Sequence, residues 1–125
     1  MKNAINWFEI PVSNYERAKK FYSEVLGVEI IDHHMDDKNV KYGIFPYDME
    51  SHRVGGALMQ MEGMNPSTDG STVYLNGGED LNRPLSKVEA AGGKVIMPKM
   101  DIQENGFIAQ FTDTEGNRVA FHSMA

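Results

Sequence analysis

The side chains best suited to acid–base or metal chemistry gather in one short segment of this sequence. His33 and His34 are adjacent, and Asp32, Asp36 and Asp37 lie close to them. Imidazole and carboxylate groups are ligands that zinc and other divalent ions accept. However, neighbouring residues of a strand point to opposite faces, so the two imidazoles cannot easily share one ion. We therefore interpret this segment as a solvated strand end followed by a polar turn.

Other common kinds of site are missing from the sequence. It contains no cysteine, which excludes disulfides, thiolate metal sites and a cysteine nucleophile. It also has no Ser–His–Asp spacing, no phosphate-binding glycine loop and no nucleotide fingerprint, since Gly55-Gly56 is too short to form one. Any metal ion would therefore have to be held by His, Asp or Glu.

The composition favours a soluble protein that acts on small molecules. The 125 residues suit a single domain, with 41% hydrophobic and 24% charged residues. The net charge of −6, without any basic cluster, argues against phosphate contacts with nucleic acid or with a membrane. No apolar run approaches the ~20 residues that cross a bilayer. Because no signal-peptide segment precedes the first strand, we expect a cytoplasmic location.

The first half of the chain predicts a strand, a helix and three more strands. Residues 4–12 read as a strand, and Ser13 with Glu16 forms a capping box that predicts the start of a helix. Apolar residues then recur at helical spacing until Gly27, which is expected to end the helix. The three strands that follow are expected at 28–34, 40–46 and 54–61.

The same order of elements recurs in the second half. Residues 63–70 have the composition of a linker, and 72–76 read as a strand. Asp80 can cap a helix that Gly92-Gly93 would end. The last three strands are expected at 95–97, 107–111 and 118–123.

This repetition predicts an α+β domain built from two tandem βαβββ modules. We expect a single domain over residues 1–125, with module one at about 1–62, a linker at about 63–70 and module two at about 71–125. Two such sheets, set together, would form a cupped, partly open mixed-sheet barrel with the helices outside. A ligand pocket is expected in the hollow between the modules.

Three motifs in this order carry a family resemblance. Residues 9–27 combine a strand, a polar cap, Phe21-Tyr22 and Leu26-Gly27, and further motifs occupy residues 88–95 and 111–118. Together they resemble the vicinal oxygen chelate superfamily, which includes glyoxalase I, fosfomycin resistance proteins, extradiol dioxygenases and bleomycin resistance proteins. The resemblance extends over nearly the whole chain and implies the same two-module fold.

The resemblance also implies positions for metal ligands, and these positions hold unsuitable residues. Metal-dependent members commonly use a His on the first strand of each module and a Glu on the final strand. Aligned through the motifs, these positions hold Trp7, Val73 and Ala120. The carboxylate that glyoxalase I adds near the end of its first module would fall within residues 55–58, none of which can coordinate. We therefore expect no metal ion and no other cofactor.

Two titratable residues share strand faces with the vacated ligand positions. Glu9 lies two residues after Trp7, and His122 lies two residues after Ala120. Glu9 and His122 are therefore the candidate catalytic residues, as a pair of proton carriers. The alternative is that Glu9 accepts hydrogen bonds from backbone or solvent near a sheet end and that His122 is simply exposed.

The candidate ligand-binding residues are mainly aromatic. Trp7 offers a flat surface for stacking an aromatic or cationic ligand, although it would also serve as core filling. The aromatic and methionine candidates at strand spacing have the same alternative role in the core. The full set is Trp7, Glu9, Phe45, Met59, Tyr74, Phe107 and His122.

Two main functions and a weaker third remain open. The first is metal-independent binding of a small molecule, as in the bleomycin resistance branch, by a homodimer with no nucleic-acid or membrane partner. The second is a glyoxalase-like lyase or isomerase acting on a small carbonyl substrate, with Glu9 and His122 as proton carriers or with an unrecognised metal site. The third is a structural or regulatory partner domain.

Overall fold

Two four-stranded mixed sheets form the framework of the computed structural model, which describes residues 4–48, 50 and 53–125. The first sheet has the strand order β1-β4-β3-β2 and the second has β5-β8-β7-β6. Each sheet contains one parallel pair, β1 with β4 or β5 with β8, and its other pairs are antiparallel. The predicted α+β fold of two strand–helix–three-strand units is confirmed, and neither sheet closes on itself.

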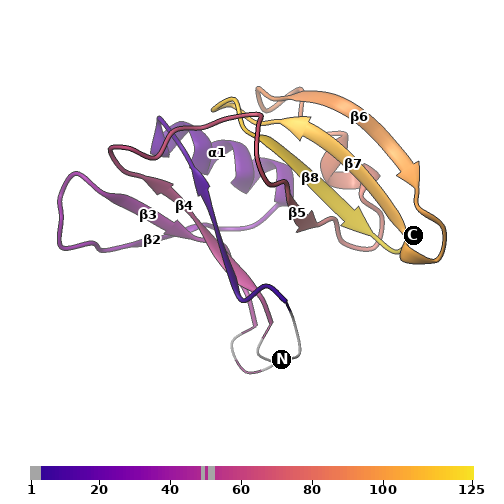
Figure 1. The fold of residues 1–125 in the computed structure, drawn as a ribbon, viewed down its shortest axis with the longest axis horizontal. Coiled ribbons are helices and arrows are strands. Elements are labelled where there is room, and N and C mark those ends of the chain that lie inside the picture. Colours follow the sequence, from indigo (N-terminus) through magenta and orange to yellow (C-terminus); the bar gives the residue numbers. More distant parts are fainter. Residues whose placement is uncertain (1–3, 49, 51–52) are drawn as a thin grey trace.

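Each half of the chain contributes one sheet and one helix (Figure 1). The first half contains β1 (Trp7–Pro11), α1 (Tyr15–Leu26), β2 (Ile31–His33), β3 (Lys41–Ile44) and β4 (Gly55–Gln60). The second half contains β5 (Val73–Asn76), α2 (Asn82–Leu85), β6 (Lys94–Asp101), a 3-10 turn (Gln103–Asn105), β7 (Phe107–Thr112) and β8 (Arg118–Ser123). Among the described residues, no helix is long and apolar enough to span a bilayer.

The start of α1 differs from the predicted capping box. Asn14, and not Ser13, is the N-cap, and its side chain accepts a hydrogen bond from the Arg17 amide at 3.1 Å. The amides of Ser13 and Asn14 donate to Glu115, at 2.9 and 2.7 Å, so Glu16 is not the reciprocal partner. A carboxylate at this position satisfies free amides and lies at the positive end of the helix dipole. The second module therefore caps the helix of the first.

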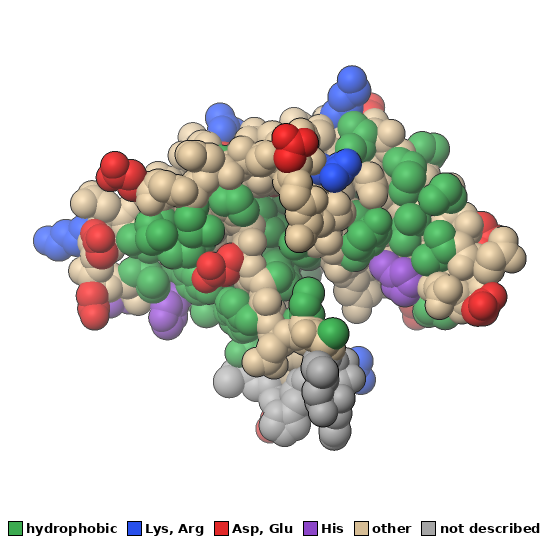
Figure 2. Space-filling view, in the orientation of Figure 1, with side chains coloured by type: hydrophobic (Ala, Val, Ile, Leu, Met, Phe, Trp, Pro, Cys, Tyr) green, Lys and Arg blue, Asp and Glu red, His purple; other side chains and the backbone are tan. Residues whose placement is uncertain are grey.

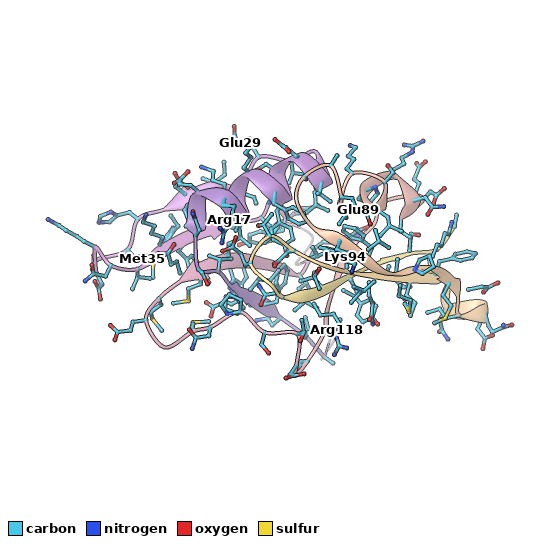
Figure 3. All side chains as sticks on the ribbon, turned by 90° about the horizontal axis from the view of Figure 1, so that it is seen from above. Arg17, Glu29, Met35, Glu89, Lys94 and Arg118 are labelled. Atoms are coloured by element: carbon cyan, nitrogen blue, oxygen red, sulfur yellow. The ribbon has the colours of Figure 1, made fainter. Side chains whose placement is uncertain are left out.

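Both helices lie on the same side of the strand layer (Figure 1, Figure 3). Helix α1 contacts the two sheets through adjacent aromatic residues. The ring of Phe21 lies 6.0 Å from that of Phe111 in the second sheet, and the ring of Tyr22 lies 5.6 Å from that of Phe45 near the first. The helix-facing sides of both sheets consequently share one hydrophobic core.

The opposite sides of the two sheets have no helix over them, and we call these sides the open faces. Strand alternation and the pairing registers assign residues to them, because their neighbours along the strands belong to the core. The open face of the first sheet includes Trp7, Glu9, Tyr42, Ala57 and Met59. The open face of the second sheet includes Tyr74, Ile108, Gln110, Ala120 and His122.

Candidate functional site

Three side chains form a hydrogen-bonded cluster on the open face of the first sheet. Trp7 Nε1 donates to the hydroxyl of Tyr42 at 2.9 Å, and this hydroxyl donates to Glu9 Oε2 at 2.7 Å. Trp7 and Glu9 come from β1, whereas Tyr42 comes from β3, on the far side of β4. The residue of β4 that lies opposite Glu9 is Ala57, whose small side chain lets Tyr42 reach across. Ala57 has no exposed surface, although it lies on an open face.

The chemistry of this cluster fixes the direction of its hydrogen bonds. An indole N–H can only donate a hydrogen bond. The Tyr42 hydroxyl therefore accepts a hydrogen bond from Trp7 and donates one to Glu9. Burial and the hydrogen bond to Glu9 raise the pKa of Tyr42, which keeps the phenol protonated at neutral pH. Among the described residues, nothing donates to the second oxygen of Glu9, Oε1. One carboxylate oxygen of the cluster therefore stays available to a ligand.

Aromatic neighbours hold the indole of Trp7 in place. The ring of Tyr47 meets it edge-on, with centroids 5.5 Å apart and planes at 82°. A Cβ atom at Gly55 would lie 2.7 Å from the Tyr47 ring, so this position of β4 requires glycine. Trp7 is nevertheless 37% exposed. The indole is thus fixed in orientation and still accessible for stacking.

The second sheet repeats this pattern on its own open face. Gln110 Nε2 donates to the Tyr74 hydroxyl at 3.2 Å. Both residues lie opposite Ala120 in the strand register, and Ala120 has no exposed surface. The motif alignment placed Val73 at this position, but Val73 packs against the core. Tyr74 therefore takes the open-face position, one residue further along β5 than the alignment indicated.

His122 lies on the same open face and is held by backbone. Its Nε2 lies 2.7 Å from the carbonyl oxygen of Asn105. Because a carbonyl only accepts, Nε2 carries the hydrogen and donates it to Asn105. The partner of Glu9 is Tyr42 of the first sheet, and the partner of His122 is Asn105 of the 3-10 turn before β7. No hydrogen bond joins the two candidates within the described part of the chain.

The remaining predicted ligand-binding residues fall on different sides of the sheets. Met59 is opposite Tyr42 on the open face of the first sheet. Phe45 belongs to the core and is only 6% exposed, and Phe107 packs against the core under Lys99. The structure thus brings five of the seven predicted residues to the open faces: Trp7, Glu9, Met59, Tyr74 and His122.

Sequence reasoning missed Tyr42 and Gln110, which complete the two hydrogen-bonded arrangements. Each lies on a different strand from its partner, with 33 residues separating Glu9 from Tyr42 and 36 separating Tyr74 from Gln110. The available signal was a polar residue on the open side of a central strand. Using that signal requires the strand register, which the sequence alone did not supply.

Two cavities lie away from the centre of the open faces. One, of about 380 Å³, lies beside α2, and its lining includes Leu85 and Val95. The other, of about 320 Å³, lies beside β2 and β3, and its lining includes His33 and Tyr42. Neither is the cavity that the sequence predicted between the modules, so that pocket stays a prediction.

The Asp32 segment, which is rich in possible ligands, serves a structural purpose. Asp32 accepts a hydrogen bond from the Tyr15 hydroxyl at 2.5 Å and from Lys19 at 2.9 Å. The Tyr15 and Lys19 hydrogen bonds lower the pKa of Asp32, so this carboxylate stays charged. Asp32 therefore ties β2 to helix α1.

Comparison with known families decides the identity of the fold. The sequence model of the Glyoxalase/Bleomycin resistance protein/Dioxygenase superfamily matches residues 4–121. The chain belongs to this superfamily. Its sequence is 30% identical over 118 residues to "Putative glyoxylase CFP32" of Mycobacterium bovis. The match includes 91% of this chain but only 43% of that relative.

Solved structures of the superfamily share the fold at low sequence identity. A mutant of glyoxalase I from Zea mays superposes with a TM-score of 0.71 at 22% identity, over 94% of this chain and 44% of that one. TnmS3, an antibiotic binding protein from Streptomyces sp. CB03234, superposes with a TM-score of 0.66 at 20% identity. That match includes 98% of this chain and 97% of TnmS3.

The open-face residues of this superfamily member do not fit a divalent metal ion. Such an ion needs about three imidazole or carboxylate ligands that converge on one point. Trp7, Tyr74 and Ala120 offer none, and one oxygen of Glu9 already accepts from Tyr42. Within the described ranges, no group of three or more His, Asp or Glu residues could hold a metal ion.

Proposed function

We propose that this chain is a metal-independent binding protein for a small molecule, with its site on the open faces between the two modules. The observation that carries the proposal is the Trp7–Tyr42–Glu9 cluster. It combines an exposed aromatic surface, a fixed orientation and one free carboxylate oxygen. Apolar and aromatic side chains with a few precisely placed polar groups are the usual lining of a ligand site. TnmS3, a fold neighbour, is itself described as an antibiotic binding protein.

Exposed apolar side chains support binding on both open faces. In the orientation of Figure 2 the helices lie behind the sheets, and hydrophobic side chains gather over the strands of both modules. Trp7, Ile31, Tyr74 and Met100 are each more than one-third exposed there. Such surfaces commonly mark ligand or protein contacts. We further propose a cytoplasmic homodimer, in which modules at about 1–62 and 71–125 line the site.

Thermal unfolding in the presence of small aromatic compounds tests this proposal. Compounds that stack on Trp7 should raise the melting temperature of the native protein, because binding to the folded state stabilises it. Trp7→Ala should remove most of this shift. Met124→Ala, which shortens a 65% exposed side chain near the C-terminus, is the control and should keep it.

Two results would count against the proposal. Equal shifts of the melting temperature in the native protein and in Trp7→Ala would show that Trp7 does not contribute to ligand binding. Stoichiometric zinc, nickel, iron or manganese in untagged protein, lost on Glu9→Gln or His122→Gln, would contradict metal independence. That second result would instead favour the enzymatic alternative.

The alternative function is a glyoxalase-like lyase or isomerase for a small carbonyl substrate. It is favoured by the 30% identity to a relative named as a glyoxylase, of which this chain spans 43%. Among the described residues, Glu9 Oε1 and His122 Nδ1 have no hydrogen-bond partner, and either atom, when unprotonated, could take a proton from a carbon next to a carbonyl. Glu9 and His122 would then be the proton carriers.

A further inference from the structure

Three polar side chains form one row across the open face of the second sheet. Arg118 of β8 lies opposite Thr112 of β7, and Thr112 lies opposite Lys94 of β6. Their neighbours Val119 and Phe111 belong to the core, so the row points to the open face. Figure 3 shows Arg118 on the side of the strands away from α1. We call these three residues the basic row.

The guanidinium of Arg118 has a buried donor without a partner. Its Nε atom is buried and makes no hydrogen bond, whereas the backbone amide of Arg118 donates to the Ser67 carbonyl at 3.3 Å. A buried donor left unpaired destabilises a folded protein unless a ligand or a water accepts from it. The Nε atom of Arg118 therefore still needs a hydrogen-bond acceptor.

Neither cation of the basic row has a salt-bridge partner among the described residues. The chain has 18 acidic and 12 basic residues. Nevertheless, no carboxylate within the described ranges forms a salt bridge with Arg118 or Lys94, whereas Arg17, Lys19 and Lys99 each have one. The row is thus a local positive site on an acidic molecule.

The spacing of the row suits a single oxyanion. Adjacent strands lie about 4.8 Å apart, so the Arg118 and Lys94 backbones are separated by roughly 10 Å, with Thr112 between them. Both long side chains can reach a group above the Thr112 hydroxyl. A guanidinium presents parallel N–H donors that match the two oxygens of a carboxylate.

We propose that the basic row binds the carboxylate, or a comparable oxyanion, of the ligand. This inference rests on the proposed binding function and names its ligand class: an apolar or aromatic molecule with one anionic group. The row also lies next to the first module, because Asn117 Nδ2 donates to the Pro11 carbonyl at 2.7 Å. This hydrogen bond joins the start of β8 to the end of β1. The apolar part of a ligand anchored at Arg118 can then lie along the open faces.

Calorimetric titration with three matched probes tests the inference. The probes are 2-naphthoate, 2-naphthyl phosphate and the neutral 2-naphthamide. The native protein should bind 2-naphthoate at least about tenfold more tightly than 2-naphthamide, because hydrogen bonds to charged groups contribute more than neutral ones. The phosphate probe shows which oxyanion the row prefers, and a preference for either anion over the amide supports the inference.

Substitutions of the two cations test whether the basic row causes the preference for 2-naphthoate. Arg118→Gln should bind 2-naphthoate and 2-naphthamide equally, and Lys94→Gln should reduce the difference between them. Arg118→Lys keeps the charge but loses the paired donors, so it should retain only part of the preference. Lys20→Gln makes the same charge change on an exposed position of α1 and should leave the preference intact.

Other outcomes would overturn the inference and can be told apart from failure of the proposed function. Suppose that the native protein binds 2-naphthoate and 2-naphthamide with equal affinity and that Trp7→Ala weakens both affinities. This result would rule out oxyanion binding by the basic row but would support the proposed binding function. A preference for 2-naphthoate over 2-naphthamide that persists in Arg118→Gln would also rule out oxyanion binding by the basic row. If no probe binds the native protein, both the inference and the proposed function fail.

Discussion

At the scale of single residues, the open faces use alanine to bring distant polar side chains together. Ala120 lies between the hydrogen-bonded residues Tyr74 and Gln110, whereas Ala57 lies opposite Glu9 and diagonally from Tyr42; neither alanine has exposed surface. A larger residue at position 120 would separate Tyr74 from Gln110. The cluster is therefore a property of neighbouring strands, not of one motif.

Tyr42→Phe should uncouple Trp7 from Glu9 while keeping the ring. Without the hydroxyl, Trp7 Nε1 and Glu9 Oε2 both lose their partner, so Trp7 fluorescence should shift and the affinity for an aromatic ligand should fall several-fold. Loss of these partly exposed hydrogen bonds should lower the free energy of unfolding by about 1 kcal/mol. Fluorescence spectra, ligand titration and urea unfolding measure the three effects.

The pH dependence of Tyr42 gives an independent check on this substitution. Burial and Glu9 raise the pKa of Tyr42 above the usual value near 10, as burial also does for Tyr15 and Tyr22, so Tyr42→Phe should show one high-pH tyrosine titration fewer than the native protein. Stabilisation by the protonated phenol should be complete below its unfolded pKa and disappear as the pH rises through the folded pKa. Tyr74→Phe is the control, and an unchanged tyrosine titration in Tyr42→Phe would contradict the assignment.

At the scale of secondary structure, the sequence predicted the elements better than their ends. Periodicity and stop residues located strands β1 to β8 of the described residues and helix α1, and Gly27 ends α1 with a φ of 66° as expected. Strand β6 is longer than expected and α2 is shorter, because the segment after Leu85 continues in irregular turns. These differences arise from tertiary packing, which local propensity does not include.

The N-terminal cap of α1 shows why part of the structure could not be predicted from the sequence. The sequence correctly indicated a helix start near Ser13, because a capping residue followed by apolar periodicity is a local signal. The partner that completes the cap is Glu115, which is 101 residues from Asn14. Arg17 binds the same carboxylate through two nitrogens, at 2.7 and 3.1 Å. No local pattern could connect the two segments.

Glu115→Gln should destabilise the protein by about 2–3 kcal/mol, because the Glu115 side chain has no exposed surface and accepts several charged or backbone hydrogen bonds. Burial alone would raise the pKa of Glu115, but hydrogen bonds from Arg17 and from the Asn14 and Ser13 amides lower it overall. Its contribution should therefore be present above the unfolded pKa of the carboxyl and be lost as the pH falls through the lower folded pKa.

Urea unfolding at neutral and acidic pH measures this prediction. The difference in unfolding free energy between native protein and Glu115→Gln should shrink as the solution is acidified below the unfolded pKa. Glu16→Gln makes the same change in the first turn of α1 at an exposed position and should cost far less. Equal effects of the two substitutions would show that Glu115 acts only through its charge near the helix.

At the scale of the whole molecule, the two modules are joined by packing as well as by polar contacts. Helix α1 belongs to the first module but places Phe21 against Phe111 of the second sheet, in the shared core. The buried Tyr22 hydroxyl donates to Asp113 at 2.7 Å, across the same boundary. A module removed from its partner would expose this apolar surface. The repeat in the sequence therefore does not imply two independent folding units.

Unfolding followed by two probes should accordingly give a single transition. Trp7 is the only tryptophan and reports on the first sheet, whereas far-ultraviolet circular dichroism reports on both modules. With one shared core, the two signals should have the same midpoint in urea, and Glu115→Gln should move both midpoints together. A fluorescence transition that precedes the loss of circular dichroism would mean that the first module opens alone. In that case the open faces could not act as one rigid site, since the Trp7 cluster and the basic row belong to different modules.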